Sequence, residues 1–485
     1  MTAIADRPHL FIGGAWERPR DGSDVVVRNP ATGAELATAA LGGPGDIDAA
    51  VAAARVSFDS GVWAGTKPTE RARVLSAAAD LLEARAGELA VSITSELGCP
   101  IWFSERAHVP NPIRHLRYYA HLAETFDYDQ TRTDGTNTSV VSQLPVGVVA
   151  AITPWNGPLS TPSLKVGPAL AAGCSVVLKP APETPLTIYA MAEALAEAGL
   201  PDGVFSIVPG GREVGAHLVS HPEVDKIAFT GSTLAGKAIM QAAAQRIARV
   251  TLELGGKSAA IVLDDADPAH VVPALLPMIL MVNGQACIAQ TRLLVPRSRQ
   301  REFIDAMAGA FGSQIVGDPL DPRTTMGPLI NQRQRDRVVG YIEEGRRQGA
   351  RVVAGDDLSL PAALAGGWFV PPTILADVSN SMTVAQDEIF GPVLAVIPYD
   401  GEDDAVRIAN DSRYGLSGSV WGIDEDRAYR VARRMRTGMV GVNGRPQAYG
   451  TPFGGFKESG IGREMGPEGF ASYLEPMTVA VGAGR

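Results

Sequence analysis

The chain has 485 residues, of which 45% are hydrophobic and 20% charged, and its formal net charge is −10. This length exceeds what one hydrophobic core usually supports, so roughly two to four domains are expected. The acidic balance argues against a nucleic-acid-binding surface, and the ordinary composition excludes a disordered or fibrous chain.

Cysteine usage and the apolar segments indicate where the protein resides. Three cysteines, Cys99, Cys174 and Cys287, are an odd number in a long chain, which argues against a disulfide framework and favours a reducing compartment. The first residues lack the basic and apolar segments of a signal peptide, and no stretch is apolar enough to cross a bilayer. Only His217 and His221 fall at a helical i, i+4 interval, and the proline after His221 ends that helix, so no metal site is expected. A cytoplasmic protein with no membrane or nucleic-acid partner is predicted.

The first 145 residues predict a short strand, long helices and a protruding hairpin. Residues 10–16 are typical of a strand and turn, and polar, glycine-containing residues interrupt a strand-like pattern over 126–144. This second pattern predicts a hairpin or an interdomain strand. Helices rich in Ala, Leu and Glu are expected with Asp46 and Thr69 as their N-caps, over residues 46–59 and 69–98.

From residue 146 onward, apolar strands alternate regularly with helices. Continuous apolar strands between helices indicate parallel strands buried on both faces, and therefore a doubly wound α/β domain. Its ligand crevice should lie at the carboxyl ends of the strands. The expected strands are residues 146–152, 175–179, 204–208, 226–230 and 250–254, and the expected helices are residues 163–172, 187–198, 213–220 and 233–245.

A second α/β unit is expected after Gly256. Its first strand, residues 259–263, and an apolar helix, residues 268–281, lead to Cys287, which should therefore lie between the two domains. Strands are then expected at residues 292–296, 393–397 and 440–442, and helices near residues 299–312, 332–349, 402–411 and 424–436.

A glycine-rich turn follows the strand 226–230. Gly231 and Ser232 precede the next helix, and Gly236 lies in its first turn. Glycines let the backbone approach a phosphate, and a helix N-terminus supplies free N–H groups and a positive dipole. Ordinary helix caps look similar, so this turn by itself fits a phosphate site or a plain cap.

Three side chains could carry chemistry at the domain boundary. Cys287 lies among small residues, although composition alone leaves a structural cysteine as an equal alternative. Glu253 ends a strand and could activate water against an acylated thiol. Asn156 follows another strand, and its amide could donate to an oxyanion. Taken singly, Glu253 is also typical of an exposed strand end and Asn156 of a turn.

Seven motifs in order give these residues a common context. They are FIGGAW, TPWN, FTGSTLAG, ELGGK, GQAC, EIFGPV and PFGGFKESGIGRE. Together they resemble the NAD(P)-dependent aldehyde dehydrogenase superfamily over nearly the whole chain. The resemblance implies Cys287 as the nucleophile, Glu253 as the base for hydrolysis of a thioester, and Asn156 with the backbone N–H of Cys287 as the oxyanion hole.

The resemblance also implies an aldehyde dehydrogenase-like α/β fold with two doubly wound domains and a β oligomerisation arm. The dinucleotide-binding domain would comprise residues 1–125 and 146–255, the catalytic domain residues 256–465, and the arm residues 126–145 and 466–485. Related enzymes are dimers or tetramers, so a homotetramer or homodimer is expected.

The cofactor site follows from the same resemblance. Lys179 would contact the adenosine ribose and Ser232 the pyrophosphate, while Glu388 and Phe390 would hold the nicotinamide ribose. The full implied set is Ile152, Thr153, Pro154, Trp155, Lys179, Gly231, Ser232, Gly236, Leu254, Glu388 and Phe390. Related chains often have a glutamate three residues after the lysine, where this chain has Pro182. Glu183 is expected to point elsewhere, so NAD is predicted, with NADP as the alternative.

The resemblance places six residues along the aldehyde tunnel: Gly157, Thr161, Leu164, Ala286, Ile288 and Phe453. None of them is lysine or arginine, which predicts a neutral, apolar aldehyde rather than a carboxylate-bearing semialdehyde. The alternatives are a CoA-acylating aldehyde dehydrogenase, which Glu253 disfavours, and a non-catalytic cofactor-binding or structural protein on the same scaffold. The presence of all three catalytic side chains disfavours the latter.

Overall fold

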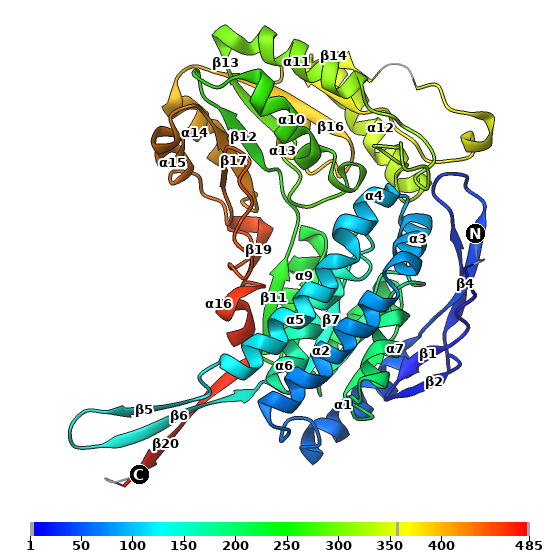
Figure 1. Ribbon diagram of the computed structural model, residues 1–485, viewed down its shortest axis with the longest axis vertical. Helices are drawn as coiled ribbons and strands as arrows, with labels where there is room; N and C mark the ends of the chain where they lie inside the picture. Colours follow the sequence, from blue (N-terminus) through cyan, green and yellow to red (C-terminus); the bar gives the residue numbers. More distant parts are fainter. Residues whose placement is uncertain (1–3, 356–357, 483–485) are drawn as a thin grey trace.

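Two mixed β-sheets form the centres of two α/β lobes, and a thin β arm projects from one end of the molecule (Figure 1). This computed structural model describes residues 4–355 and 358–482. The predicted fold class, two α/β units with a β arm, is confirmed. None of the helices in the described ranges combines the length and apolar character needed to cross a bilayer.

The first lobe is built on a sheet with the strand order β19-β11-β10-β7-β8-β9-β1-β2. Its five central strands are parallel and carry the predicted apolar segments: β7 (Val148–Ile152), β8 (Ser175–Lys179), β9 (Phe205–Ile207), β10 (Lys226–Thr230) and β11 (Arg249–Glu253). Three short antiparallel strands lie at its two edges: β1 (Leu10–Ile12), β2 (Ala15–Glu17) and β19 (Gly460–Ile461).

Helices cover both faces of this sheet, as a doubly wound fold requires. One face packs against α1 (Pro44–Ser60), α8 (Arg212–Ser220) and α9 (Thr233–Ala244). The other packs against α2 (Pro68–Ala84), α3 (Ala86–Leu97), α5 (Pro110–Thr125), α6 (Ser160–Ala172) and α7 (Tyr189–Glu197). A separate pair, β3 (Ser23–Arg28) and β4 (Glu35–Leu41), lies beside this lobe.

Two expectations for the N-terminal helices were wrong. The predicted helix 69–98 is divided between α2 and α3, because Arg85 leaves the helical conformation with φ −104° and ψ 13°. The N-caps are Gly43 and Lys67, each followed by a proline whose fixed φ suits the first helical position. Asp46 lies three residues inside α1 and accepts a hydrogen bond from the Gly43 N–H at 2.9 Å.

The second lobe has the strand order β14-β15-β16-β13-β12-β17-β18. Only β14 is antiparallel to its neighbour. The strands are β12 (Ala259–Val262), β13 (Arg292–Pro296), β14 (Arg351–Ala354), β15 (Thr373–Ala376), β16 (Val393–Tyr399), β17 (Gly418–Trp421) and β18 (Gly441–Val442). The sequence analysis did not predict β14, β15 or β17.

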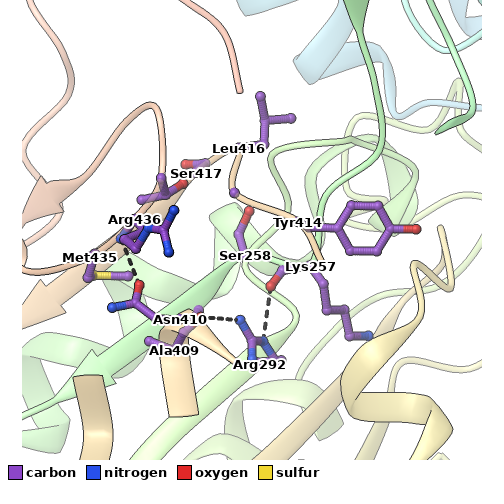
Figure 2. Close-up of a pocket in the computed structure, with 13 residues that line it drawn as sticks. Lys257, Ser258, Arg292, Ala409, Asn410, Tyr414, Leu416, Ser417, Met435 and Arg436 are labelled. Atoms are coloured by element: carbon purple, nitrogen blue, oxygen red, sulfur yellow. Dashed lines mark hydrogen bonds between the residues drawn. The ribbon is translucent and has the colours of Figure 1, made fainter. Parts of the chain in front are cut away.

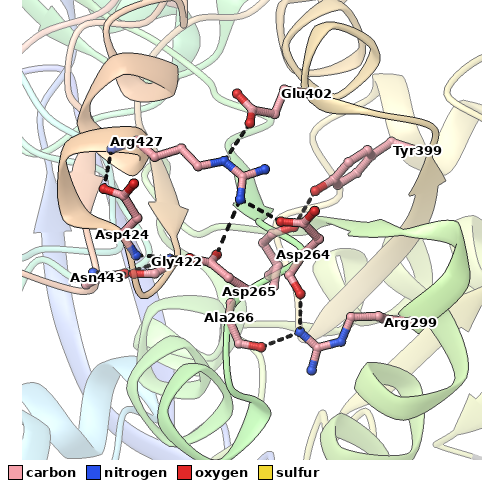
Figure 3. Close-up of polar contacts among 11 residues, drawn as sticks. Asp264, Asp265, Ala266, Arg299, Tyr399, Glu402, Gly422, Asp424, Arg427 and Asn443 are labelled. Atoms are coloured by element: carbon pink, nitrogen blue, oxygen red, sulfur yellow. Dashed lines mark hydrogen bonds and ion pairs between the residues drawn. The ribbon is translucent and has the colours of Figure 1, made fainter.

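Helices also cover both faces of the second sheet. α10 (Pro268–Ile279) and α11 (Gln300–Gly312) share one apolar cluster. The opposite cluster contains α12 (Gln332–Arg347), α13 (Thr383–Gln386), α14 (Glu402–Asn410) and α15 (Glu425–Ala432). Arg427 joins three of these segments by ion pairs of 2.6 Å to Asp264, after β12, and to Glu402, on α14 (Figure 3).

The arm is a three-stranded antiparallel sheet. The hairpin predicted within residues 126–144 supplies two of its strands. β5 (Asp129–Thr133) pairs with β6 (Thr138–Pro145), which pairs in turn with β20 (Leu474–Val481) from the end of the chain. The helix α16 (Gly466–Ala471) precedes β20. Residues 1–3, 356–357 and 483–485, which fall within the predicted domain ranges, lie outside the described residues.

Candidate active site

The carboxyl ends of β7 and β11 meet the segment that carries Cys287. Asn156 follows β7, Glu253 is the last residue of β11, and Cys287 lies between a 3-10 turn, Met281–Gly284, and β13. The three predicted catalytic side chains, which are far apart in sequence, are thus delivered to one region by the parallel sheet and the crossing between the lobes.

The turn before Cys287 has an unusual backbone. Val282, Asn283 and Gly284 have φ values of 51°, 58° and 78°, in the left-handed region that most side chains avoid. The buried Asn283 amide stabilises this turn, because its Nδ2 donates to the carbonyls of Gly98 (2.9 Å) and Pro328 (2.8 Å) and its Oδ1 accepts from the Gly327 N–H (2.8 Å). Neighbouring structure therefore fixes the conformation that presents the thiol.

Asn156 lies against the same segment. Its Nδ2 donates to the carbonyl of Gln285 at 2.8 Å, and the Gln285 side chain is itself anchored to Val282 and Ile330. An amide nitrogen carries two protons, so the second N–H of Asn156 is available to an oxyanion.

The glycine pair Gly255–Gly256 brings the strand of Glu253 close to the cysteine. A Cβ on Gly256 would lie 2.4 Å from the carbonyl oxygen of Cys287, too close for any side chain. The Gly256 N–H donates to Glu388 Oε1 at 2.9 Å. One tight turn thus sets the positions of Cys287 and Glu388 relative to each other.

A small polar cavity lies behind this turn (Figure 2). Arg292 of β13 is buried there and donates to the carbonyl of Lys257 at 3.0 Å and to those of Ile408 and Ala409 at 3.0 and 2.9 Å. These bonds fasten the ELGGK segment to the strand that follows the cysteine. Burial lowers the pKa of Lys257, which also lines the cavity, to about 7.

Burial and neighbouring carboxylates control the ionisation of the reactive groups. Burial, with the charges of Glu388 and Glu253, raises the pKa of the Cys287 thiol to about 12. Burial and the charge of Glu464 raise the pKa of Glu253 well above its usual range, and Lys165 and Arg463 oppose this shift. Glu253 is 2% exposed and neither of its carboxylate oxygens has a hydrogen-bond partner among the described residues. An acceptor in this state can bind a proton or a water molecule.

Sequence reasoning missed the buried ion pair next to Glu253. Lys165 Nζ of α6 lies 2.5 Å from Glu464 Oε1 and 2.6 Å from Thr230 Oγ1. The only signal in the sequence was a charged residue on an apolar helix, which by itself does not reveal its partner.

The predicted cofactor residues line the ends of the same strands. Lys179 ends β8 and donates to the carbonyls of Gly210 (2.6 Å) and Pro180 (3.1 Å). Ser232 is the N-cap of α9, with its side chain accepting from the Ala235 N–H, and Gly231 precedes it. Gly236 lets α9 approach Leu254, because a Cβ there would meet that side chain at 2.6 Å. The exposed N-terminus of α9 can therefore receive a phosphate.

An aromatic contact joins the two lobes near these strand ends. The rings of Trp155, after β7, and Phe390, before β16, meet edge to face with centroids 5.4 Å apart. The remaining predicted residues of this group, Ile152, Thr153 and Pro154, continue β7 towards Trp155, and the Thr153 N–H donates to the Lys179 carbonyl at 3.1 Å.

Three of the six predicted tunnel residues contact the same apolar cluster. Leu164, Ala286 and Phe453 pack against it as partly buried side chains. Gly157 is buried next to Thr161, whose Oγ1 would lie 2.6 Å from a Cβ at position 157. Ile288 is partly exposed beside Cys287. Of the six predicted tunnel residues, Thr161 has a hydroxyl, Phe453 is aromatic and the other four are small or aliphatic.

A doubly wound α/β sheet that brings a thiol, a carboxylate and an amide together at its strand ends is the arrangement expected of an oxidoreductase with a dinucleotide cofactor.

Comparisons with known proteins identify the family. A model of the aldehyde dehydrogenase family matches residues 16–479. A geranial dehydrogenase from Castellaniella defragrans is 48% identical over 469 residues, covering 96% of this chain and 97% of the relative. The chain therefore belongs to the aldehyde dehydrogenase family.

Solved structures agree with this assignment. An aldehyde dehydrogenase from Mycobacterium tuberculosis in complex with NAD+ is similar with a TM-score of 0.97 and 46% identity, covering 99% of each chain. A mutant aldehyde dehydrogenase from Pseudomonas syringae in complex with NAD+ and octanal gives a TM-score of 0.94 at 41% identity, covering 99% of this chain and 97% of the other. The protein is thus an enzyme that oxidises an aldehyde to the carboxylic acid.

Proposed function

We propose that this enzyme oxidises neutral, apolar aldehydes with NAD, using Cys287 as its nucleophile. The observation that carries the proposal is the convergence of the Cys287 segment, the Asn156 amide and the buried Glu253 carboxylate, with Asn156 hydrogen-bonded to the residue two positions before the thiol.

The residues have separate tasks in this reaction. The Cys287 thiol releases its proton to solvent, and its sulfur bonds to the aldehyde carbon. The carbonyl oxygen becomes an oxyanion that accepts hydrogen bonds from the free N–H of Asn156 and from the Cys287 backbone N–H. NAD, when bound, would accept the hydride that leaves this carbon, and a thioester on Cys287 remains. Glu253 then takes a proton from water, whose oxygen attacks the thioester and releases the acid and the thiol. A buried carboxylate with a raised pKa is a stronger base than an exposed one and suits this step.

The residues at the strand ends fit this cofactor. Lys179 would hold the adenosine ribose, Ser232 and the N-terminus of α9 the pyrophosphate, and Glu388 with Phe390 the nicotinamide ribose. The exposed helix N-terminus and the Gly231 turn support a phosphate there, because both offer backbone N–H groups.

The substrate class rests on the tunnel and on relatives. Leu164, Ala286, Ile288 and Phe453 offer no charged partner to a carboxylate-bearing aldehyde. The relative named geranial dehydrogenase and the relative bound to octanal point to the same class. We further propose that the protein acts in the cytoplasm as a homodimer or homotetramer assembled through the arm.

A panel of aldehydes tests this function. Purified enzyme should form NADH with octanal or geranial at a kcat/KM at least about tenfold above that with succinate semialdehyde, because an unpaired buried carboxylate costs more than 1.4 kcal/mol. Cys287→Ser should bind NAD with unchanged affinity yet form no NADH.

Two results would contradict the proposal. NADH formation by Cys287→Ser at the wild-type rate would exclude the thiol as nucleophile. A preference for succinate semialdehyde would exclude the apolar substrate class.

Adding coenzyme A should leave the product a free acid, since Glu253 directs the thioester to water.

A further inference from the structure

A charged cluster lies where the first lobe faces α12. Lys179 ends β8, Glu183 follows four residues later, and Arg333 is in the first turn of α12. Glu183 Oε1 accepts from Arg333 Nη2 at 3.2 Å. The side chain of Glu183 is 22% exposed and that of Arg333 is 82% exposed, so the carboxylate is the sheltered member and the guanidinium lies at the rim.

Glu183 also acts on Lys179. Burial lowers the pKa of Lys179 to about 8, and the Glu183 carboxylate opposes that shift. The charge of the carboxylate therefore affects the lysine.

Hydrogen bonds anchor the chain directly after Glu183. Thr184 Oγ1 donates to the Trp155 carbonyl at 3.1 Å. Further along, the buried Glu96 carboxylate accepts from the N–H groups of Leu186 (2.9 Å) and Thr187 (3.2 Å). The position of Glu183 is thus set by the fold and does not depend on the exposed arginine alone.

The face of α12 that carries Arg333 extends along the proposed cofactor cleft. One turn after Arg333, Arg337 donates to the carbonyl of Glu388 at 2.6 Å, and Gln334 donates to that of Phe390 at 2.8 Å. The helix therefore reaches from the lysine proposed for the adenosine ribose to the residues proposed for the nicotinamide ribose.

We propose that Glu183, held by Arg333, is the carboxylate that makes this enzyme select NAD over NADP. The inference rests on the proposed function, which places the adenosine ribose beside Lys179. Pro182 has no side-chain acceptor, and Glu183 takes over the task of accepting from the ribose hydroxyls. Its negative charge repels a 2′-phosphate that the flanking cations, Lys179 and Arg333, would otherwise attract.

Calorimetric titration of NAD and NADP into the purified enzyme tests this proposal without relying on turnover. The wild type should bind NAD more tightly than NADP. Glu183→Gln should shift the ratio of the two dissociation constants towards NADP by about tenfold or more, because two cations then remain beside the 2′ position. Arg333→Gln should shift the ratio in the opposite direction, since it removes one of these cations and keeps the carboxylate.

Arg335→Gln provides a matched control. Arg335 is on the same helix and pairs with Asp336 at 3.4 Å, so its loss changes the net charge equally and should leave the ratio within about twofold of wild type. An unchanged ratio in Glu183→Gln with a wild-type melting temperature would overturn the inference, as would a wild-type preference for NADP. A wild type that binds neither dinucleotide would instead overturn the proposed function.

Discussion

At the scale of single residues, the proposed role of Glu253 as the base depends on the protonation of its carboxylate. Its carboxylate is buried, lacks a hydrogen-bond partner among the described residues, and feels the opposing charges of Glu464 and Lys165. Glu464 and Lys165 form a buried ion pair with each other. The pKa of Glu253 therefore depends on an ion pair between two neighbouring residues.

Changing either member of this pair should move the pH dependence in a predictable direction. Glu464→Gln removes a negative neighbour and should lower the pKa of Glu253, so the rising limb of kcat should move to lower pH by about one unit. Lys165→Met removes a positive neighbour and should move the limb to higher pH. Steady-state profiles over about pH 5 to 9 measure both shifts.

Circular dichroism should first establish that both variants are folded, because breaking a buried pair destabilises a protein by about 3–5 kcal/mol. Shifts of the two limbs in the same direction would show that these charges do not control the base.

At the scale of elements, the turn Met281–Gly284 is the piece of structure on which the thiol depends. It contains three consecutive left-handed residues and packs so closely that a Cβ on Gly284 would lie 2.2 Å from the Gly391 carbonyl carbon. The side chain of Asn283 stabilises this conformation through hydrogen bonds with backbone groups of two other segments.

Asn283→Ala should therefore destabilise the enzyme by about 2–4 kcal/mol, because the buried carbonyls of Gly98 and Pro328 and the Gly327 N–H lose their partner. Urea unfolding monitored by fluorescence measures this loss, and the labelling rate of Cys287 by a thiol reagent reports on the turn.

Asn137→Ala, in the exposed turn of the arm, is the comparison for this change. It should alter the free energy of unfolding by less than about 0.5 kcal/mol. Equal effects of the two substitutions would mean that Asn283 has no special part in holding the turn.

At the scale of the whole molecule, the arm of a single chain exposes apolar side chains to solvent. Leu144, Met477 and Val479 expose 41%, 45% and 43% of their surface on its strands. Apolar side chains on a projecting sheet are typical of a surface that pairs with another chain.

The double variant Met477→Asp, Val479→Asp should accordingly dissociate the predicted oligomer, because it places two charges in an apolar contact. Light scattering during size-exclusion chromatography measures the mass. Thr478→Asp changes the residue between them, which points to the opposite face of the strand, and should keep the oligomer. A wild-type enzyme that elutes as a monomer would exclude the role of the arm.

The sequence by itself determined the central strands of the first lobe and the class of reaction. Apolar runs fixed the parallel strands β7, β8, β10 and β11 to within a residue or two, because a strand buried on both faces needs an unbroken apolar segment. The motifs around Cys287, Glu253 and Asn156 indicated the reaction class, which the family assignment confirms. Helix boundaries were predicted less well, because Arg85 divides the expected helix 69–98 and the N-caps are Gly43 and Lys67 in place of Asp46 and Thr69.

Only the tertiary structure decided the contacts between segments distant in sequence. The pairing of Lys165 with Glu464, the bond from Asn156 to Gln285 and the meeting of Glu183 with Arg333 each join residues more than 100 positions apart. Local patterns determine which residues can form a strand or a helix, but they do not contain the packing that brings two such elements together. For that reason the sequence predicted a nucleophile with its base and oxyanion donor, whereas the charges next to Glu253 and Lys179 became visible only in the fold.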